Sequence, residues 1–167
     1  MKVFAPGVLG SADVNEFLVN TKYVEKASGT TRNNTTTLTV DPDLQLHLDT
    51  NKTYFMDMIA PFTSAVAAGF KFSFFVPAGT VFTGYALFTG GTGTPSIATY
   101  SSGGNAITIN VTAASAGSGV DDIVVVRGTL DTAGTAGNIG YQWAQSTSNA
   151  GNTTVRAGSA MWIRRVS

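Results

Sequence analysis

Apolar residues recur at every second position along most of the chain after Thr35. A period of two is the pattern of β-strands that bury one face. Alternating runs lie at 38–40, 44–48, 70–76, 107–111 and 139–143. Residues 54–59 are apolar on both faces apart from Asp57 and are predicted to form a central strand, and residues 123–126 are a second two-sided run. The pattern predicts many short strands.

Glycine, asparagine, aspartate and proline gather between these runs, as in "PAGT" (77–80), "GGTGTP" (90–95), "SSGGN" (101–105) and "DTAGTAGN" (131–138). Such clusters are typical of turns, and short strands at this spacing favour an all-β fold, an antiparallel β-sandwich or jelly roll. One short helix is predicted from Asp13, with the capping-box partner Glu16, through Val19. We expect an N-terminal arm with this helix over residues 1–26 and a β-sandwich domain over residues 27–167.

The chain is unusually poor in charged residues. Charged residues make up 12% of the chain, against roughly 25% in typical domains, and the formal net charge is zero. A neutral surface excludes the basic patch that nucleic-acid or anionic-membrane binding needs, and no run reaches the length of a membrane helix. Like-charge repulsion does not keep copies apart, so self-association is expected. Threonine replaces the missing charge because it suits a strand and its hydroxyl faces water.

The candidates for chemistry are few. His47 shares its parity with Asp41, Asp43 and Asp49, so an unbroken strand would place an imidazole beside carboxylates that hold a metal or orient a base. Pro42 interrupts that strand, one histidine is few for a transition metal, and alternation alone predicts a solvated polar face. The pair at 121–122 is a weak calcium candidate, since a loop-to-strand boundary explains it better. We therefore expect no catalytic, cofactor-binding or metal-binding residues and no enzyme activity.

The aromatic residues divide into two groups. Phe70, Phe72 and Phe74 share one face, which is typical of a core. Phe82, Tyr85 and Phe88 lie in a region where both parities carry bulk, and they are predicted to form a self-interface. A sugar-stacking platform is the competing interpretation, with Trp162, Tyr100 and Tyr141 as its aromatic residues.

Two stretches resemble structural proteins of tailed-bacteriophage virions, notably phages of actinobacteria. "TTRNNTTTLTVDPDLQLHLDTNKTY" (30–54) is similar in its Thr-Arg pair, its threonine-rich strand, its "DP.L" turn and its closing Thr-Tyr. "RGTLDTAGTAGNIGYQWAQSTSNAGNTTVRAGSAMWIRRVS" (127–167) is similar in "GTL", "QWAQ.TSN", "TTV.AGS" and the terminal "RRV". The resemblance spans most of residues 16–167.

This resemblance implies a β-sandwich module of a head-decoration, head-fibre or minor tail protein, and it brings no catalytic residues. A small, charge-poor copy behind a short N-terminal segment fits a capsid decoration (cement) protein better than a fibre. The expected partners are the major capsid protein and further copies in a trimer or dimer. We expect synthesis in the host cytoplasm and a place on the outer capsid surface at capsomer junctions. The alternative is a glycan- or receptor-binding module of a head fibre or tail protein.

The residues expected to contact the capsid or a neighbouring copy are the apolar side chains of the N-terminal arm, namely Val3, Phe4, Val8 and Leu9.

Overall fold

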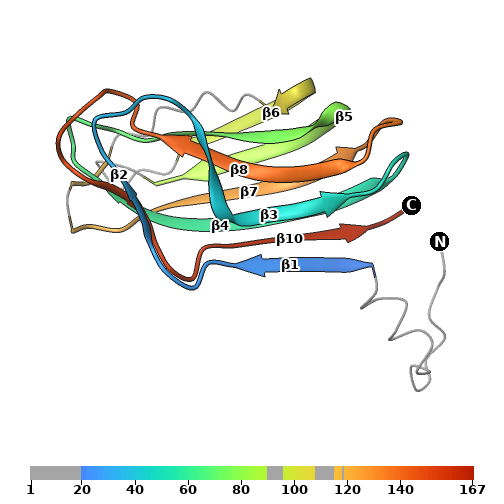
Figure 1. Ribbon diagram of the computed structural model, residues 1–167, viewed down its shortest axis with the longest axis horizontal. Coiled ribbons are helices and arrows are strands. Elements are labelled where there is room, and N and C mark those ends of the chain that lie inside the picture. Colours follow the sequence, from blue (N-terminus) through green and yellow to red (C-terminus); the bar gives the residue numbers. More distant parts are fainter. Residues whose placement is uncertain (1–19, 90–95, 108–114, 118) are drawn as a thin grey trace, which may run out of the picture.

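The protein is all-β. The computed structural model describes residues 20–89, 96–107, 115–117 and 119–167, with the backbone alone for 96–107. The strands are β1 (Thr21–Glu25), β2 (Thr30–Arg32), β3 (Thr39–Leu48), β4 (Thr53–Ser64), β5 (Lys71–Phe88), β6 (Ser96–Ile107), β7 (Asp122–Asp131), β8 (Gly137–Ala144), β9 (Thr153–Val155) and β10 (Ala160–Arg165) (Figure 1). The described residues contain no helix. The helix predicted at 13–19 lies outside them.

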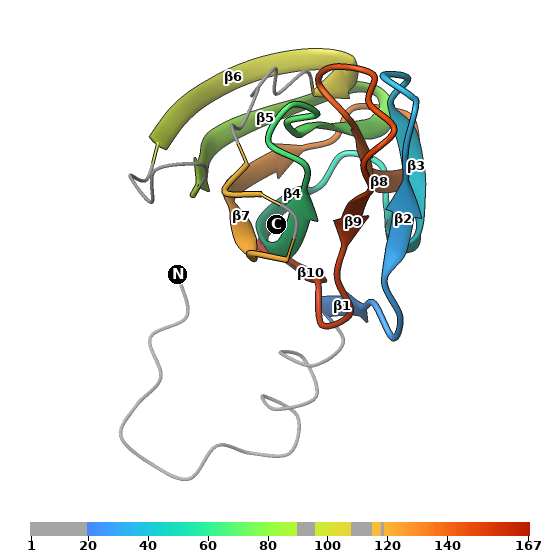
Figure 2. The same cartoon turned by 90° about the vertical axis from the view of Figure 1, so that its left-hand side faces the viewer.

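All strand pairs of the described chain are antiparallel, which confirms the predicted all-β, antiparallel character of the fold. The main order is β1-β10-β4-β7-β5-β8-β3, with β6 beside β5 and with β9 between β4 and β2. Figure 2 shows the sheet curving until its two ends come together. Lys22 Nζ of β1 bridges the ends by donating to the His47 carbonyl of β3 at 2.8 Å. The result is a nearly closed, rolled sheet, while jelly-roll connectivity stays a prediction.

Strand β5 joins the two sides of the roll. Its residues 71–75 pair with β8 and its residues 81–88 pair with β7. On its other edge, the ladder with β6 shifts register between Phe75 and Thr80. The predicted turns at 77–80 and 101–105 are therefore wrong, since both segments lie inside the long β5–β6 hairpin. Pro77 has no N–H for a ladder, and Gly79 adopts a φ of 79°. These two residues bend the strand without ending it.

The core fills the inside of the roll. The predicted stripe of Phe70, Phe72 and Phe74 is 0–1% exposed, which confirms it as core. Phe70 packs its ring 4.1 Å from that of Phe62 and 5.9 Å from that of Trp143. Other buried residues come from both sides of the roll, namely Leu44, Leu48, Met56, Met58, Val124, Val126, Leu130, Ile139, Tyr141, Met161 and Ile163.

The sheet begins earlier in the chain than residue 27, the predicted start of the β-sandwich domain. Strand β1 occupies residues 21–25, which were grouped with the N-terminal arm, and it pairs along its whole length with β10. Strands β2 and β9 were not predicted, because each is three residues long and carries too short a pattern for a period to be read.

Candidate functional site

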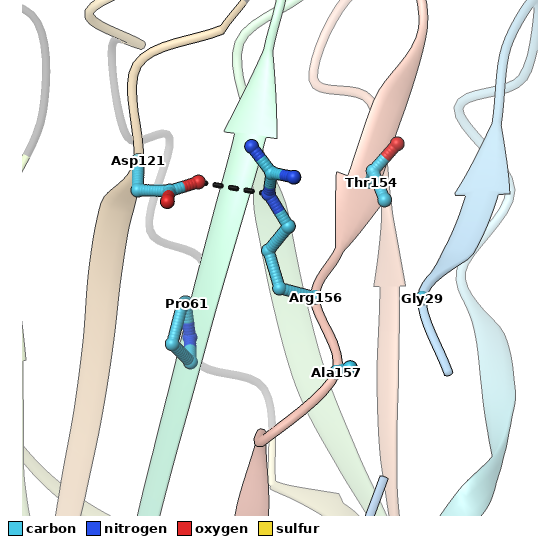
Figure 3. A pocket seen from close by; sticks show the side chains of 6 residues that line it. All are labelled: Gly29, Pro61, Asp121, Thr154, Arg156 and Ala157. Carbon is cyan, nitrogen blue, oxygen red and sulfur yellow. Dashed lines mark hydrogen bonds and ion pairs between the residues drawn. The ribbon is translucent and has the colours of Figure 1, made fainter. Parts of the chain in front are cut away.

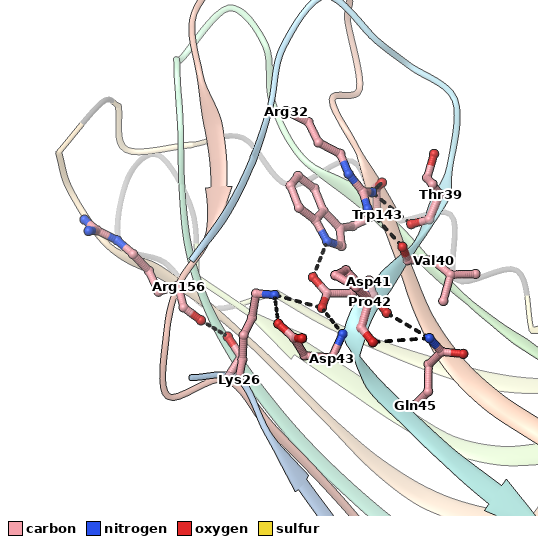
Figure 4. Close-up of polar contacts among 11 residues, drawn as sticks. Lys26, Arg32, Thr39, Val40, Asp41, Pro42, Asp43, Gln45, Trp143 and Arg156 are labelled. Carbon is pink, nitrogen blue, oxygen red and sulfur yellow. Dashed lines mark hydrogen bonds and ion pairs between the residues drawn. The ribbon is translucent and has the colours of Figure 1, made fainter. Parts of the chain in front are cut away.

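The arginine of the Thr-Arg pair and the tryptophan of "QWAQ" meet in space. Arg32, on β2, holds its guanidinium 4.0 Å above the ring of Trp143, on β8. The same guanidinium donates to the carbonyls of Thr39 at 2.8 Å and Val40 at 3.1 Å, and also to the carbonyl of Trp143. A planar fork with several donors suits this combination of stacking and bonding, whereas a lysine would not. Arg32 therefore fastens β2 to β3 and β8 (Figure 4).

Beneath this pair lies a buried carboxylate. Asp41 is 0% exposed, and one of its oxygens accepts from the indole Nε1 of Trp143 at 3.0 Å. The other oxygen accepts from Lys26 Nζ at 2.9 Å and from the backbone N of Asp43 at 3.1 Å. Lys26 is itself 1% exposed and reaches the Asp43 carboxylate at 2.7 Å. Each buried charge thus has an opposite charge, which is the condition for burying it at acceptable cost.

We call Lys26, Arg32, Asp41, Asp43 and Trp143 the latch. It joins residues from both stretches that carry the phage resemblance, and every one of its side chains is engaged within the chain. Burial is also the largest influence on Arg32, and it lowers the pKa of that guanidinium from its ordinary value. The latch side chains therefore stabilise the fold.

The rest of the "QWAQ.TSN" stretch is also structural. The buried Gln145 donates to the carbonyl of Gly151 at 2.7 Å and accepts from the backbone N of Asn149 at 3.0 Å. Ser64 and Thr153 share a buried hydroxyl–hydroxyl bond of 2.7 Å. The two Gln145 bonds satisfy loop backbone groups that would otherwise lose hydrogen bonds to water.

The acidic residues near His47 do not assemble around it. A register shift between Val40 and Gln45 turns Asp41 inward, away from the side on which His47 is exposed. His47 contacts Asn138 at 3.3 Å through Nδ1 and Asp49 at 3.8 Å through Nε2. Among the described residues, no cluster of three His, Asp or Glu side chains is arranged to hold a metal. The common parity of 41, 43, 47 and 49 was therefore not a common face.

The pair at 121–122 has intramolecular partners as well. Asp121 accepts a hydrogen bond from Arg156 Nε at 2.8 Å, and Asp122 accepts one from the backbone N of Ala116 at 2.9 Å. Arg156 crosses an open groove of about 460 Å³ to reach Asp121, above Pro61 (Figure 3). The groove is lined by Gly29, Pro61, Asp121, Thr154, Arg156 and Ala157. The predicted turn at 90–95 lies outside the described residues.

A row of large side chains runs across the outside of the sheet. The strand registers place Tyr23 opposite Trp162, Trp162 opposite Asp57, Asp57 opposite Arg127, and Arg127 opposite Tyr85. These five residues come from β1, β10, β4, β7 and β5 in spatial order, and we call them the central row. Residues directly opposite in antiparallel strands lie about 5 Å apart at Cβ. The central row is thus a continuous band about five strands wide.

The middle of the central row is an ion pair. Arg127 donates to Asp57 Oδ2 through Nε at 2.9 Å and also through a terminal nitrogen. Asp57 is 4% exposed, whereas half of the Arg127 side chain is exposed. The Asp57 contacts raise the pKa of Arg127 above its ordinary value, so the guanidinium stays charged. The row therefore carries one acid and one base, without net charge.

On β4 and β7, three apolar side chains and a threonine flank the central row. Ile59 faces Val125 across β4 and β7 on one side of it, and Phe55 faces Thr129 on the other. All four are partly exposed, because their strands bury the opposite face in the core. Tyr23 at 56% and Tyr85 at 37% stand out at the two ends. We call these outward residues of β1, β10, β4, β7 and β5 the outer face.

The predicted self-interface of Phe82, Tyr85 and Phe88 does not lie on one exposed surface. The predicted contacts of the N-terminal arm stay a prediction. Of the predicted self-interface residues, only Tyr85 lies on the outer face. Phe82 is 1% exposed, and its ring covers the paired glycines Gly84 and Gly128, so it belongs to the core. Phe88 packs against the same core. Val3, Phe4, Val8 and Leu9 lie outside the described residues.

The proposed sugar-stacking aromatic residues are not brought together. Tyr141 is fully buried, which excludes it from surface contact, and burial raises the pKa of its hydroxyl well above the ordinary value. Trp162 is half-buried on the outer face. The side chain of Tyr100 lies outside the described residues. Sequence reasoning missed Tyr23 and the Asp57–Arg127 pair, although the two-sided runs at 54–59 and 123–126 carried the signal for an apolar outer face.

Comparisons with known proteins gave limited likenesses. No family model and no curated protein sequence matches the chain. Among solved structures, the chain is similar to that of infectious bursal disease virus Gt strain, with 12% identity, a TM-score of 0.21 and coverage of 88% of this chain and 38% of the other. The VP2 subviral particle of that virus gives 11% identity, a TM-score of 0.22 and coverage of 86% and 40%. The chain thus spans about two fifths of the length of these viral chains.

No helix within the described part of the chain is long and apolar enough to span a membrane.

Proposed function

We propose that this protein is a structural component of a bacteriophage virion, a decoration protein that binds the outer surface of the head. The major capsid protein is the proposed partner, and stabilisation of capsomer junctions is the proposed role. The supporting observation is the packing of Arg32 on Trp143. The two stretches that resemble phage virion proteins lie about a hundred residues apart, yet their signature residues share one buried network, as parts of a single module would.

The surface chemistry supports the same role. Three lysine or arginine side chains that are at least partly exposed pair with aspartates, at Lys22–Asp49, Arg127–Asp57 and Arg156–Asp121. Long-range steering is weak on such a surface, and recognition depends on shape and short-range bonds. A capsid lattice suits weak contacts, because linked sites raise avidity by about 10²–10⁴ without any new contact.

Binding to purified phage shells tests the proposal. The full chain, mixed with mature shells of its phage, is expected to co-sediment in copies that follow the capsomer number. A chain lacking residues 2–10 is expected to keep the unfolding transition of the full chain and to lose shell binding. Undiminished binding by the shortened chain would exclude the arm as the contact. Absence of binding by the full chain would exclude decoration.

A glycan- or receptor-binding module is the second proposal, because Tyr23 is 56% exposed beside Trp162 and aromatic rings can stack on sugars. Two measurements separate the proposals. Hundreds of copies per virion support decoration, whereas a few copies together with glycan-array binding that is lost in Tyr23→Ala support the receptor role.

A further inference from the structure

We infer that Lys26 and Asp41 become joined by a covalent amide between their side chains, formed by the folded chain itself. Lys26 directly follows β1, and Asp41 lies near the start of β3. These two strands meet where the roll closes, so the amide is a covalent fastening of that seam. The chain has no cysteine for a disulfide there. The inference goes beyond the proposed function and does not depend on it.

The two reacting groups are buried in contact with each other. Among the described lysines, Lys26 is the only buried one, and its Nζ lies 2.9 Å from Asp41 Oδ1 (Figure 4). A carboxyl C–O bond is about 1.23 Å long, so the Cγ of Asp41 lies within about 4.1 Å of that nitrogen. A near-attack distance is roughly 3–3.5 Å, which a small adjustment of the side-chain torsions reaches.

Burial supplies the neutral amine that the reaction requires. The ion pair of the latch is the reactant, and both of its side chains are 0% exposed, which makes separate charges costly to hold. Transfer of one proton along the hydrogen bond from Lys26 Nζ to Asp41 Oδ1 leaves a neutral amine beside a neutral carboxylic acid. A desolvated lysine amine is an activated nucleophile, and a carboxylic acid accepts attack that a carboxylate repels.

Two neighbouring groups provide the rest of the chemistry. Trp143 Nε1 donates to Asp41 Oδ2 at 3.0 Å, so it stabilises the negative charge that develops on this oxygen during attack. Asp43 Oδ2 lies 2.7 Å from Lys26 Nζ, within reach of the proton that the nitrogen must lose. The Asp43 side chain is 42% exposed, which gives the released water a way out. Asp41 is therefore the electrophile and Asp43 the proton carrier.

The reaction balances without a co-reactant. The lone pair of Lys26 Nζ attacks Cγ of Asp41, and the electrons of the C=O bond move onto Oδ2. Asp43 takes one proton from the nitrogen and passes it to the Oδ1 hydroxyl, which leaves as water while the carbonyl re-forms. The products are one amide, one water and the Asp43 carboxylate in its original state. The reaction is a single turnover within one chain.

Intact-mass spectrometry of the denatured full chain tests the inference. The expected mass is about 18 Da below that of the sequence, because one water is lost. Trypsin is expected to leave Lys26 uncleaved and to release peptide 23–32 joined to peptide 33–52. The matched control is Lys22→Arg, at the partly exposed lysine that pairs with Asp49, and it should keep the loss of mass.

Three variants assign the roles of the residues. Lys26→Arg keeps a cation but has no amine to form the amide, so it should retain its full sequence mass. Asp43→Asn removes the proton carrier at an exposed side chain and should also retain its full mass, with folding checked by circular dichroism. Asp41→Asn should instead lose about 17 Da, because ammonia leaves in place of water. A purely structural role of Asp41 does not predict that change.

Two results would overturn the inference: a folded full chain that keeps its complete sequence mass after prolonged incubation, or a loss of water that maps to other residues. A cross-link that persists in Asp43→Asn would overturn the role of Asp43. The ion pair and the amide both need Lys26, so the mass separates them where stability does not. Shell binding is measured independently, and a chain without the amide that decorates shells leaves the proposed function intact.

Discussion

The buried lysine of the latch gives the sharpest test of how the fold is held. Lys26→Met preserves most of the aliphatic stem and removes the ammonium that lies 2.9 Å from Asp41 and 2.7 Å from Asp43. Asp43 is 42% exposed on its side chain and can be solvated, whereas Asp41 is fully buried. The variant therefore leaves one carboxylate without a counter-charge.

The expected loss follows from that single charge. Removing one partner of a buried ion pair costs about 3–5 kcal/mol. The lower end applies here, because Asp41 keeps its hydrogen bonds from Trp143 Nε1 and from the backbone N of Asp43. A loss of about 3 kcal/mol is a large share of the 5–15 kcal/mol that stabilises a typical domain. Urea unfolding followed by the fluorescence of Trp143 and Trp162 measures it.

A matched control lies four residues earlier. Lys22 also pairs with an aspartate, Asp49 at 3.5 Å, but the two side chains are 34% and 46% exposed. Lys22→Met should cost about 0–1 kcal/mol, as exposed pairs do. The double variant Lys26→Met with Asp41→Asn should recover part of the loss, since the amide oxygen still accepts from the indole. Equal losses in Lys26→Met and Lys22→Met would refute the reasoning.

Three further predictions concern the latch, the turn after β3 and the sheet. Arg32→Lys should lower the free energy of unfolding by about 2 kcal/mol, because an ammonium cannot both stack and bond to the neighbouring carbonyls; urea titration measures it, and an unchanged midpoint would contradict it. The Tyr54 hydroxyl is the main cause that lowers the pKa of Asp49. This stabilisation is present above the unfolded pKa of Asp49 and is lost as the pH falls through its folded pKa, so Tyr54→Phe should destabilise more near pH 7 than near pH 3, and an NMR titration should show the pKa rise. Gly84→Ala should cost about 3 kcal/mol because its Cβ meets backbone and a ring at 2.7 Å, whereas Gly134→Ala, with open space around it, should cost nothing in thermal unfolding.

The strand content was readable from the sequence because a period of two is a local property. Phe70, Phe72 and Phe74 alternate with Lys71 and Ser73, so the three rings point to the same face of the sheet. An antiparallel sheet buries such an apolar face, and all three rings are buried here. Turn chemistry was less informative. The segments 77–80 and 101–105 have turn composition, yet both lie inside the β5–β6 hairpin. Residues 101–104 pair with 80–83 of β5, whereas 76–79 form the irregularity where the register of the ladder shifts.

The latch and the outer face depended on tertiary structure. Asp41 and Trp143 are 102 residues apart, and nothing local indicates that an indole would donate to that carboxylate. The composition alone indicated a neutral chain with little charge repulsion against self-association. The two-sided apolar runs indicated apolar side chains on the outward face as well as in the core. Only the strand order decided that Tyr23, Trp162, Asp57, Arg127 and Tyr85 form one row. Parity along a strand gives two faces, and which face the rest of the chain covers is settled by packing.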